Sequence, residues 1–427
     1  MKPDTLVTDN IHQIMRSLGE HAREAYRSLA QASAQQKDTA LKAAAAHLRE
    51  NESAILSANA KDLAFGREKQ LSPALLDRLE LSPARIESIA KGLEDIAALP
   101  DPVGRELSAF EGRNNGLHIR RVSVPLGVIG IIYESRPNVT ADAAGLCIKS
   151  GNAAILRGGS ECLHSSSAIA ASLHTGLKKA GLPEHAVQMV PVRDRAAVGE
   201  MLTMTRYIDI IVPRGGKSLT QRIQEESRIP TILHLDGNCH TYVHSKANLD
   251  QAVSIIANAK MRRTGICGAT ESLIIDESII DKALPEIADR LIALGCELRG
   301  DARAKQADSR LNSANEDDWG TEYLDAILSV KTVRTLDEAI AHINRYGSHH
   351  TDAILTEDAA AAEQFTREID SAIVMVNSST QFADGGEFGM GAEIGISTGR
   401  LHARGPVGCE QLTTYKYVVS SDGAIRS

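Results

Sequence analysis

The chain has 427 residues, of which 43% are hydrophobic and 24% charged, a balance typical of a folded globular protein with two or three domains. Its net charge of −8 at pH 7 and aromatic content of only 3% argue against nucleic-acid binding, which needs a basic surface or stacking rings. The longest apolar runs, such as Val128–Ile132, are far too short to span a membrane.

The cysteines suggest a reducing compartment. They are scattered, without CxxC pairs or the regular spacing of a disulfide framework or zinc site. Residues 1–18 lack the apolar core of a signal peptide. We therefore expect a cytoplasmic protein with reduced thiols and no bound metal. The six are Cys147, Cys162, Cys239, Cys267, Cys296 and Cys409.

The first hundred residues predict helices. Between residues 9 and 99, apolar side chains recur at helical spacing, as in Ile11–Leu18 and Leu41–Leu48. Ser72-Pro73 and Ser82-Pro83 are typical N-cap and first-turn pairs, which start new helices. This segment is expected to flank a larger domain.

A hairpin is predicted next, followed by a first series of alternating strands and helices. Residues 112–116 have turn chemistry, and residues 117–124 alternate apolar and polar side chains. Because strands then alternate with helices, we expect a parallel sheet covered on both faces. The predicted strands are Gly127–Tyr133, Ala153–Arg157, Ala186–Pro191, Tyr207–Val212 and Thr231–Leu235, with helices at Ser165–Ala180 and Arg195–Thr203.

A second series of the same kind predicts a second α/β domain. The residues from 412 to 420 then read as a last strand without a following helix, which would pair at a sheet edge, in this chain or a neighbouring subunit. The predicted strands are Glu271–Ile275, Ala326–Val333, Ala353–Thr356 and Ala372–Val376, with helices at Glu277–Leu294 and Leu336–Arg345.

Cys267 is the candidate nucleophile. It lies among small residues, with Gly265 before it and Gly268 after it, just ahead of an aliphatic strand. Such a loop can bring a thiolate to about 3–3.5 Å from a carbonyl carbon, with backbone N–H groups facing the developing oxyanion. A plain buried thiol is the alternative. Cys239 is a rival nucleophile, but bulky neighbours make it the weaker candidate.

Two glycine turns between strands and helices favour dinucleotide binding. Gly158, Gly159 and Ser160 follow one predicted strand, and Gly215 and Gly216 follow another. Glycine lets a cofactor approach the backbone, and a helix N-terminus favours anions. Neither turn matches GxGxxG or GxxxxGK[ST], so each could also be a plain βα turn.

Charged residues near these turns suggest specificity. Arg157 could pair with a 2′-phosphate, which favours NADP over NAD. Arg136 or Asn138, after the first sheet strand, could reach a bound anion or oxyanion, whereas an Arg136–Glu134 surface pair is the alternative. The histidines at 234, 240, 342, 349 and 350 have no metal-binding spacing, so metal binding is not expected.

Five segments in this order resemble the aldehyde dehydrogenase superfamily and, within it, the branch that reduces γ-glutamyl phosphate. The most specific is the segment 333–354, which is similar to that branch's signature at every fixed position. The others are PLGVIGIIYESRPNVT at 125–140, HLDGNCHTYV at 234–243, TEYLDAILSV at 321–330 and HARGPVG at 402–408.

The resemblance implies roles for individual residues. Cys267 takes the place of the catalytic thiol, and Glu322 that of the glutamate that holds the nicotinamide ribose. Arg157 stands where a lysine commonly contacts the adenosine ribose. Asn138 is the choice for the oxyanion-donating asparagine, with Arg136 as its competitor. The substrate pocket is expected at Asn377, Ser378, Ser379 and Phe388.

One departure from the hydrolytic members concerns His234, which stands where they carry a glutamate that activates water. An acyl-phosphate reductase should not hydrolyse its thioester, and a carboxylate there would repel a phosphate. The substitution supports the phosphate branch and leaves open whether His234, assigned to the substrate site, takes part in chemistry.

The resemblance implies an NADPH-dependent reduction of L-glutamyl 5-phosphate to L-glutamate 5-semialdehyde. A CoA-acylating or ordinary aldehyde dehydrogenase, and a non-catalytic binding protein, are the alternatives. The expected partners are a second copy of the chain, in a dimer or tetramer, and transiently a glutamate 5-kinase. The expected fold is α/β, with a cofactor-binding domain at 1–105 and 123–235, a catalytic domain at 236–410, and an oligomerisation arm at 106–122 and 411–422.

Overall fold

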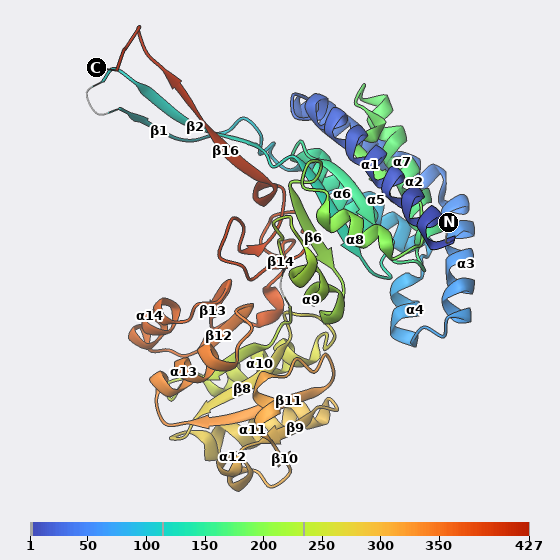
Figure 1. Cartoon of the computed structure of the whole chain (residues 1–427). Helices are drawn as coiled ribbons and strands as arrows, with labels where there is room; N and C mark the ends of the chain where they lie inside the picture. Colours follow the sequence, from blue (N-terminus) through green and yellow to red (C-terminus); the bar gives the residue numbers. More distant parts are fainter. Residues whose placement is uncertain (1–2, 113–114, 234, 427) are drawn as a thin grey trace. The chain divides into compact units, whose positions relative to one another are not determined.

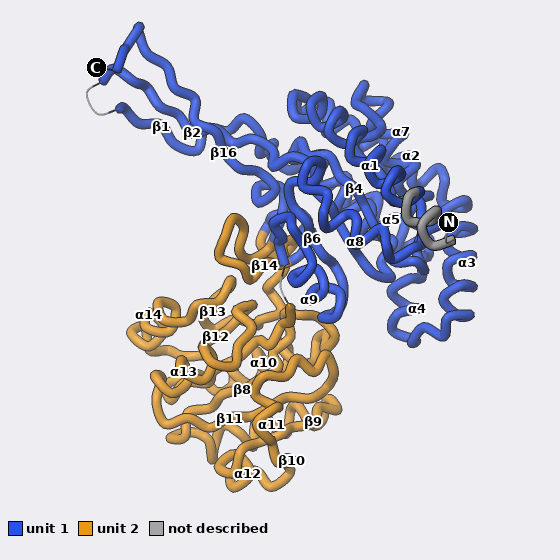
Figure 2. Tube along the Cα trace, in the orientation of Figure 1, with its two compact units in different colours: residues 1–233, 389–395, 407–427 blue, residues 234–388, 396–406 orange. Residues whose placement is uncertain are grey.

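The computed structural model describes residues 3–112, 115–233 and 235–426. The chain forms two compact units, shown in Figure 2. Unit 1 comprises residues 1–233, 389–395 and 407–427, and unit 2 comprises residues 234–388 and 396–406. Each unit holds a parallel sheet, and unit 1 also carries an antiparallel arm. The predicted α/β class is therefore confirmed.

Residues 389–395 and 407–410 belong to unit 1, whereas the sequence prediction placed them in a continuous catalytic domain at 236–410. The reason is their pairing with each other. Ile394 N–H donates to the Val407 carbonyl at 2.9 Å, and Val407 N–H donates to the Gly395 carbonyl at 2.8 Å. Gly391 has a positive φ of 78°, and a Cβ there would lie within 3.0 Å of the Leu99 side chain.

Helices begin unit 1, as predicted (Figure 1). The Ser72 and Ser82 hydroxyls accept from the backbone N–H groups of Leu75 and Arg85, so both predicted helix starts are confirmed. Leu41 and Leu48 are fully buried. The helices are α1 (Pro3–Leu29), α2 (Ala34–Glu50), α3 (Glu52–Glu68), α4 (Pro73–Leu79) and α5 (Pro83–Ala98).

The parallel sheet of unit 1 has the strand order β5-β4-β3-β6. The chain moves outward from β3 to β4 and β5 and then returns to the other side of β3, so the strand order reverses between β3 and β6. Ligands of open α/β sheets bind at such a point, outside the carboxyl ends of the strands. The elements are β3 (Val128–Tyr133), α6 (Val139–Lys149), β4 (Ala153–Arg157), α7 (Leu163–Lys179), β5 (Val187–Met189), α8 (Ala196–Thr203), β6 (Ile210–Arg214) and α9 (Lys217–Glu226).

The predicted strand Thr231–Leu235 is wrong, since Thr231 forms only an isolated bridge with Ile211. Ile211 N–H donates to the Pro230 carbonyl, and the Ile211 carbonyl accepts from Ile232 N–H, both at 2.9 Å. The described residues of this segment form no further strand pairing. Residue 234 lies outside the described residues.

Unit 2 is built on a seven-stranded parallel sheet with the order β10-β9-β11-β8-β7-β12-β13. The four predicted strands are present as β8, β11, β12 and β13. Its elements are β7 (Cys239–Val243), α10 (Leu249–Met261), β8 (Thr270–Asp276), α11 (Ile280–Ala293), β9 (Glu297–Gly300), α12 (Ala302–Ala307), β10 (Asn312–Ser313), η2 (Glu316–Gly320), β11 (Ile327–Val333), α13 (Leu336–Tyr346), β12 (Thr351–Leu355), α14 (Ala359–Glu368), β13 (Ile373–Val376) and η3 (Thr380–Phe382).

Strand β7, near the middle of this sheet, was not predicted. Every one of its side chains is buried, so its sequence shows no alternation. Its polar residues are satisfied inside the protein. His240 Nδ1 pairs with Asp352 Oδ1 at 3.1 Å, and the Thr241 hydroxyl shares a hydrogen bond of 2.8 Å with Thr270.

The arm of unit 1 consists of β1 (Glu106–Glu111), β2 (His118–Pro125) and β16 (Thr413–Ser420), all antiparallel. The predicted hairpin is confirmed, although residues 113 and 114 of its turn lie outside the described residues. The predicted last strand pairs with β2 of its own chain over its whole length. None of the described helices is long and apolar enough to cross a membrane.

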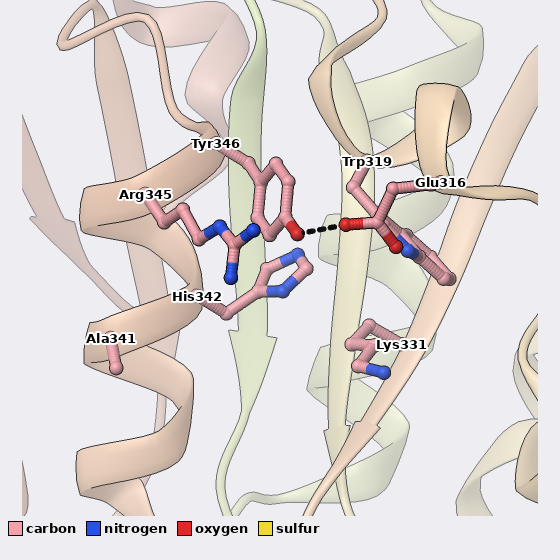
Figure 3. Close-up of a pocket in the computed structure, with 7 residues that line it drawn as sticks. All are labelled: Glu316, Trp319, Lys331, Ala341, His342, Arg345 and Tyr346. Carbon is pink, nitrogen blue, oxygen red and sulfur yellow. Dashed lines mark hydrogen bonds between the residues drawn. The ribbon is translucent and has the colours of Figure 1, made fainter.

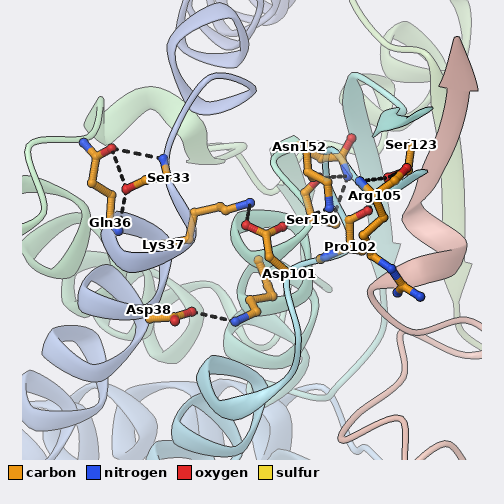
Figure 4. A network of polar contacts seen from close by, with 12 residues as sticks. Ser33, Gln36, Lys37, Asp38, Asp101, Pro102, Arg105, Ser123, Ser150 and Asn152 are labelled. Atoms are coloured by element: carbon orange, nitrogen blue, oxygen red, sulfur yellow. Dashed lines mark hydrogen bonds and ion pairs between the residues drawn. The ribbon is translucent and has the colours of Figure 1, made fainter. Parts of the chain in front are cut away.

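Buried polar contacts fasten the arm to the helices (Figure 4). Lys37 and Lys149 are each 1% exposed, and their ammonium groups lie 2.6 Å from Asp101 and Asp38. Asn152, fully buried, donates to the Leu412 carbonyl at 2.8 Å, directly before β16. Loss of Asp101 would leave the charge of the buried Lys37 without this partner, so the Lys37–Asp101 pair helps to fix the chain that leads into the arm.

Candidate active site

Cys267 lies in the loop between α10 and β8 of unit 2. All six cysteines lie in the described part of the chain, and Cys267 is the one that is not buried. Its side chain packs against an apolar cluster that includes Ile373, Met375 and Ala383. A partly exposed thiol beside a rigid sheet has the access that a nucleophile needs.

The rival cysteine, Cys239, is the first residue of β7 and is fully buried. Its Sγ donates to the Cys267 carbonyl at 3.1 Å and lies 3.6 Å from His350 Nδ1. Burial raises the pKa of the Cys239 thiol well above its usual value. Cys239 therefore supports the loop of Cys267 and lacks the access of a nucleophile.

The backbone at Gly237 lies directly against Cys267. A Cβ added at Gly237 would lie 2.7 Å from both Cα and Cβ of Cys267, and closer still to its carbonyl oxygen. Real Cβ atoms do not approach other atoms so closely, so only glycine allows this arrangement. The sequence analysis assigned Gly237 no role, although this glycine lies within the segment 234–243 that resembles the family.

Gln381 and two threonines hold the ends of the Cys267 loop. The buried Gln381 amide donates to the carbonyls of Ala259 and Arg263, each at 3.0 Å. At the other end, the Thr270 hydroxyl shares a hydrogen bond of 2.9 Å with Thr380. The position of Cys267 is thus set by contacts on both sides of the loop.

Glu322 lies in a segment of unit 2 that approaches the same loop. Leu324 N–H donates to Glu271 Oε1 at 3.2 Å, and the Leu324 carbonyl lies 3.9 Å from the Cβ position of Gly265. Glu271 also forms a fully buried ion pair with Lys260 at the end of α10. Burial raises the pKa of Glu271 to about 7, against the opposing effect of the Lys260 charge. The structure therefore brings Glu322 and Cys267 into neighbouring segments.

Asn238 connects these segments to the rest of unit 2. It is 2% exposed, and its Nδ2 donates to the carbonyls of Trp319 and Tyr346, each at 2.9 Å. Its neighbours on either side, Gly237 and Cys239, both contact Cys267. No sequence pattern indicated this role, apart from the position of a polar residue directly before a buried strand.

The residues expected in the substrate pocket have varied surroundings. The Asn377 amide is engaged with Thr356, accepting from its N–H and donating to its carbonyl at 2.8 Å each. The Ser379 hydroxyl is buried and accepts from Gln381 N–H, and the Ser378 hydroxyl donates to the Val376 carbonyl. Phe388 is 46% exposed. His234 lies outside the described residues.

In unit 1, the two glycine turns meet at the point where the strand order reverses. Tyr133 at the end of β3 pairs with Arg214 of β6, and Ile132 pairs with Arg157 of β4. Gly158 and Gly159 follow Arg157 directly. The sheet therefore places both glycine turns at the same edge, whereas Glu322, also assigned to the dinucleotide, belongs to unit 2.

Several hydrogen-bond donors at these turns already bind acceptors of the protein itself. Arg157 is 6% exposed, and its guanidinium donates to the carbonyls of Gly158, Arg193 and Asp194. Glu134 accepts from Gly216 N–H at the start of α9 at 2.9 Å. Arg157 thus holds two loops together, whatever it contributes to a ligand.

A second carboxylate, Glu161, lies at the other turn. It accepts from both the N–H and the hydroxyl of Ser135 and from the Ser160 hydroxyl. Its pKa is lowered by these hydrogen bonds despite the opposing effect of burial. Arg136, next to Ser135, is half-buried.

Asn138 precedes α6 in unit 1. Its Nδ2 donates to Asp142 Oδ2 at 2.9 Å. The amide that was predicted to donate to an oxyanion therefore already forms a hydrogen bond within the protein. Burial raises the pKa of Asp142 to about 6. The oxyanion-donating role of Asn138, with Arg136 as its competitor, stays a prediction.

Three of the six described histidines of unit 2 are buried. His240 and His350 are fully buried, and His342 is 8% exposed. Among the described residues, no group of three or more His, Cys, Asp or Glu side chains is arranged to hold a metal ion.

Comparison with known proteins places this architecture in a family. The profile of the aldehyde dehydrogenase family matches residues 10–305 and 313–418. The γ-glutamyl phosphate reductase of Rhodospirillum rubrum is 61% identical over 421 residues, which cover 99% of this chain and 98% of that protein. The protein of the same name from Paramagnetospirillum magneticum is 60% identical over 421 residues, covering 99% of each chain.

Solved structures agree with the sequence comparison. The crystal structure of the γ-glutamyl phosphate reductase of Thermotoga maritima superposes with a TM-score of 0.94 at 43% identity, covering 97% of this chain and all of that one. An acetylating aldehyde dehydrogenase from Geobacillus thermoglucosidasius shares the fold, with a TM-score of 0.69 at 18% identity over 99% of each chain. The chain therefore belongs to the aldehyde dehydrogenase family.

Proposed function

We propose that the protein is a γ-glutamyl phosphate reductase, which converts L-glutamyl 5-phosphate to L-glutamate 5-semialdehyde and phosphate, with NADPH, in proline biosynthesis. The observation that carries the proposal is the 61% identity with a protein of that name over 99% of the chain. The accessible Cys267, on a loop held from both sides, supports the chemistry.

In the proposed reaction, the Cys267 thiolate attacks the acyl carbon of the substrate, and phosphate leaves. This gives a thioester on Sγ. Reduction converts the thioester to a thiohemiacetal, which collapses to the semialdehyde and restores the thiolate. The firm support of the loop by Gly237, Gln381 and Thr270 suits a reaction in which Sγ must meet one carbon at about 3–3.5 Å.

The residues at the strand reversal of unit 1 fit a dinucleotide. Glycines follow β4 and β6, the two strands on either side of β3, and α9 presents its N-terminus at the same edge. Bound NADPH supplies the hydride for the reduction. Gly158, Gly159, Ser160, Gly215 and Gly216 would approach its phosphates, and Glu322 would hold its nicotinamide ribose.

Substitution of Arg157 tests whether the protein prefers NADPH to NADH. If its guanidinium contacts the 2′-phosphate, Arg157→Ala should raise the Kd of NADPH by about 10- to 100-fold relative to that of NADH, as loss of a charge-assisted hydrogen bond predicts. Isothermal titration with each cofactor gives the ratio. Because Arg157 also holds three carbonyls, equal weakening of both cofactors would show that its role is to shape the loops.

Phosphate dependence tests the function against its alternatives. With glutamate semialdehyde and NADP, the enzyme should form the Cys267 thioester and then need inorganic phosphate as acceptor. Without a general base, water attacks the thioester about 10²–10⁴-fold more slowly, so NADPH production should stop after a single turnover. The forward reaction can be followed with glutamate 5-kinase, ATP and NADPH, and Cys267→Ala should be inactive in both directions.

Two outcomes would favour other members of the family. Sustained turnover in phosphate-free buffer would indicate an ordinary aldehyde dehydrogenase. Turnover that requires coenzyme A in place of phosphate would indicate an acylating enzyme.

Gly237 offers a test of how Cys267 is positioned. Gly237→Ala should lower kcat by about 100-fold, because the new Cβ must push the Cys267 backbone away by an ångström or more. Gly265→Ala is the matched control, since only the Leu324 carbonyl lies near its Cβ position, at 3.9 Å. Steady-state kinetics of folded protein decides, and equal activity of both variants would show that this contact does not position the thiol.

The arm is proposed to join copies of the chain into a dimer or tetramer. Its outer strands expose apolar side chains that a monomer would leave in water, namely Leu107, Phe110, Tyr415, Tyr417 and Val419, each 44–57% exposed. Both β1 and β16 also have a free edge within the described three-stranded sheet.

Placing a charge on this arm should therefore break the assembly. We expect Tyr417→Lys with Val419→Lys to sediment as a monomer, and Thr414→Lys, on the alternate face of β16, to keep the wild-type mass. A wild type that sediments as a monomer would contradict the proposal. A cytoplasmic location, which the six unpaired thiols favour, is open to cell fractionation.

A further inference from the structure

The buried carboxylate of Glu271 connects the strand that follows Cys267 to the segment that carries Glu322. Glu271 is the second residue of β8 and is fully buried. Its Oε2 pairs with the fully buried ammonium of Lys260 at the end of α10. Its Oε1 accepts from Leu324 N–H at 3.2 Å. Because Lys260 holds one oxygen, the carboxylate is oriented and its other oxygen faces the Leu324 backbone.

The chain turns at Leu324, two residues after Glu322. Leu324 has a φ of +54°, in the left-handed region that a residue with a side chain adopts where its surroundings hold it. Its side chain is 45% exposed, so apolar packing contributes little to holding this conformation. The hydrogen bond to Glu271 therefore supports the backbone at the residue where the segment turns.

The chain that leads to Glu322 is anchored by side chains of unit 2. Figure 3 shows the Tyr346 hydroxyl donating to Glu316, at the start of η2. The Tyr323 hydroxyl, directly after Glu322, donates to Asp318 Oδ1 at 2.6 Å. With these residues fixed, the path of the chain past Glu322 is set by the turn that follows.

The carboxylates of Glu271 and Glu322 lie close enough to interact. Burial raises the pKa of Glu271 to about 7, Lys260 opposes this rise, and the negative charge of Glu322 adds to it. Because its side chain is fully buried, Glu271 cannot itself touch a cofactor. It can act on one only through the groups that it holds.

We propose that Glu271 is a positioning residue for Glu322: by accepting from Leu324 N–H, it fixes the turn that directs the Glu322 carboxylate to the nicotinamide ribose. This inference rests on the proposed cofactor role of Glu322. The requirement is an acceptor for the Leu324 N–H, and the charges of the Lys260–Glu271 pair serve to orient that acceptor.

Two double variants separate the acceptor from the charges. Lys260→Met with Glu271→Gln removes both buried charges and keeps an oxygen for the Leu324 N–H, whereas Lys260→Met with Glu271→Met removes that oxygen as well. The Kd of NADPH is measured by isothermal titration. We expect the Gln variant to bind within about threefold of the wild type. The Met variant should bind about tenfold more weakly, the loss also expected for Glu322→Gln when a hydrogen bond to a charged group is removed.

Two further measurements show whether the effect passes through Glu322. Adding Glu322→Gln should weaken NADPH binding by about tenfold in the Gln variant and cause no further loss in the Met variant, because coupled residues are not additive. Adenosine 2′,5′-bisphosphate, which lacks the nicotinamide ribose, should bind equally well to all of these variants. Circular dichroism identifies a variant that fails to fold, and Glu271→Leu, which also lacks an acceptor, then replaces Glu271→Met.

The outcomes separate this inference from the proposed function. Equal NADPH affinity of the two double variants, with Glu322→Gln still weakening binding to the wild type, would overturn the positioning role alone. Parallel weakening of NADPH and adenosine 2′,5′-bisphosphate would also overturn it, since the damage would then extend beyond the ribose contact. If Glu322→Gln left the wild-type affinity unchanged, the proposed cofactor role of Glu322 would be wrong, and the positioning role with it.

Discussion

The position of Cys267 depends on one close contact, between its backbone and that of Gly237. Because this contact leaves no room for a side chain, the entry to β7 and the Cys267 loop act as one piece. The Sγ of Cys239 and the amide of Asn238 then extend this piece to the Cys267 carbonyl and to the carbonyls of Trp319 and Tyr346. A reactive thiol on a mobile loop would lose the near-attack geometry that thioester formation requires.

Buried charge has a similar fixing role in both units. Lys260 and Glu271 are fully buried and tie the end of α10 to β8, while Leu324 N–H binds the same carboxylate. Such a pair gives little net stability compared with apolar packing, but losing one partner would leave an uncompensated charge. The segments carrying Cys267 and Glu322 therefore separate only at high cost.

The sequence predicted what depends on local periodicity and missed what depends on tertiary contacts. The helix starts at Ser72 and Ser82 and the aliphatic strand after Cys267 were correct, since caps and apolar runs are local signals. Strand β7 was missed, because its polar His240 and Thr241 are satisfied by partners distant in sequence, Asp352 and Thr270.

The candidate site shows the same limit. Residue chemistry and family resemblance indicated Cys267, but no pattern in one sequence shows that Gly237 or Gln381 supports it. The ligand-binding roles of Arg157 and Asn377 stay predictions. Their side chains suit a ligand by type, yet in the structure they bind backbone carbonyls and N–H groups of the protein itself. A charged or amide group near a turn can fix two loops as readily as it can bind a ligand. Glu134, which accepts from the Gly216 N–H, is a further example.

For phosphates to reach the start of α9, the Glu134 carboxylate must move or the phosphates must lie beside the turn, since two anions cannot share one helix N-terminus without strong repulsion.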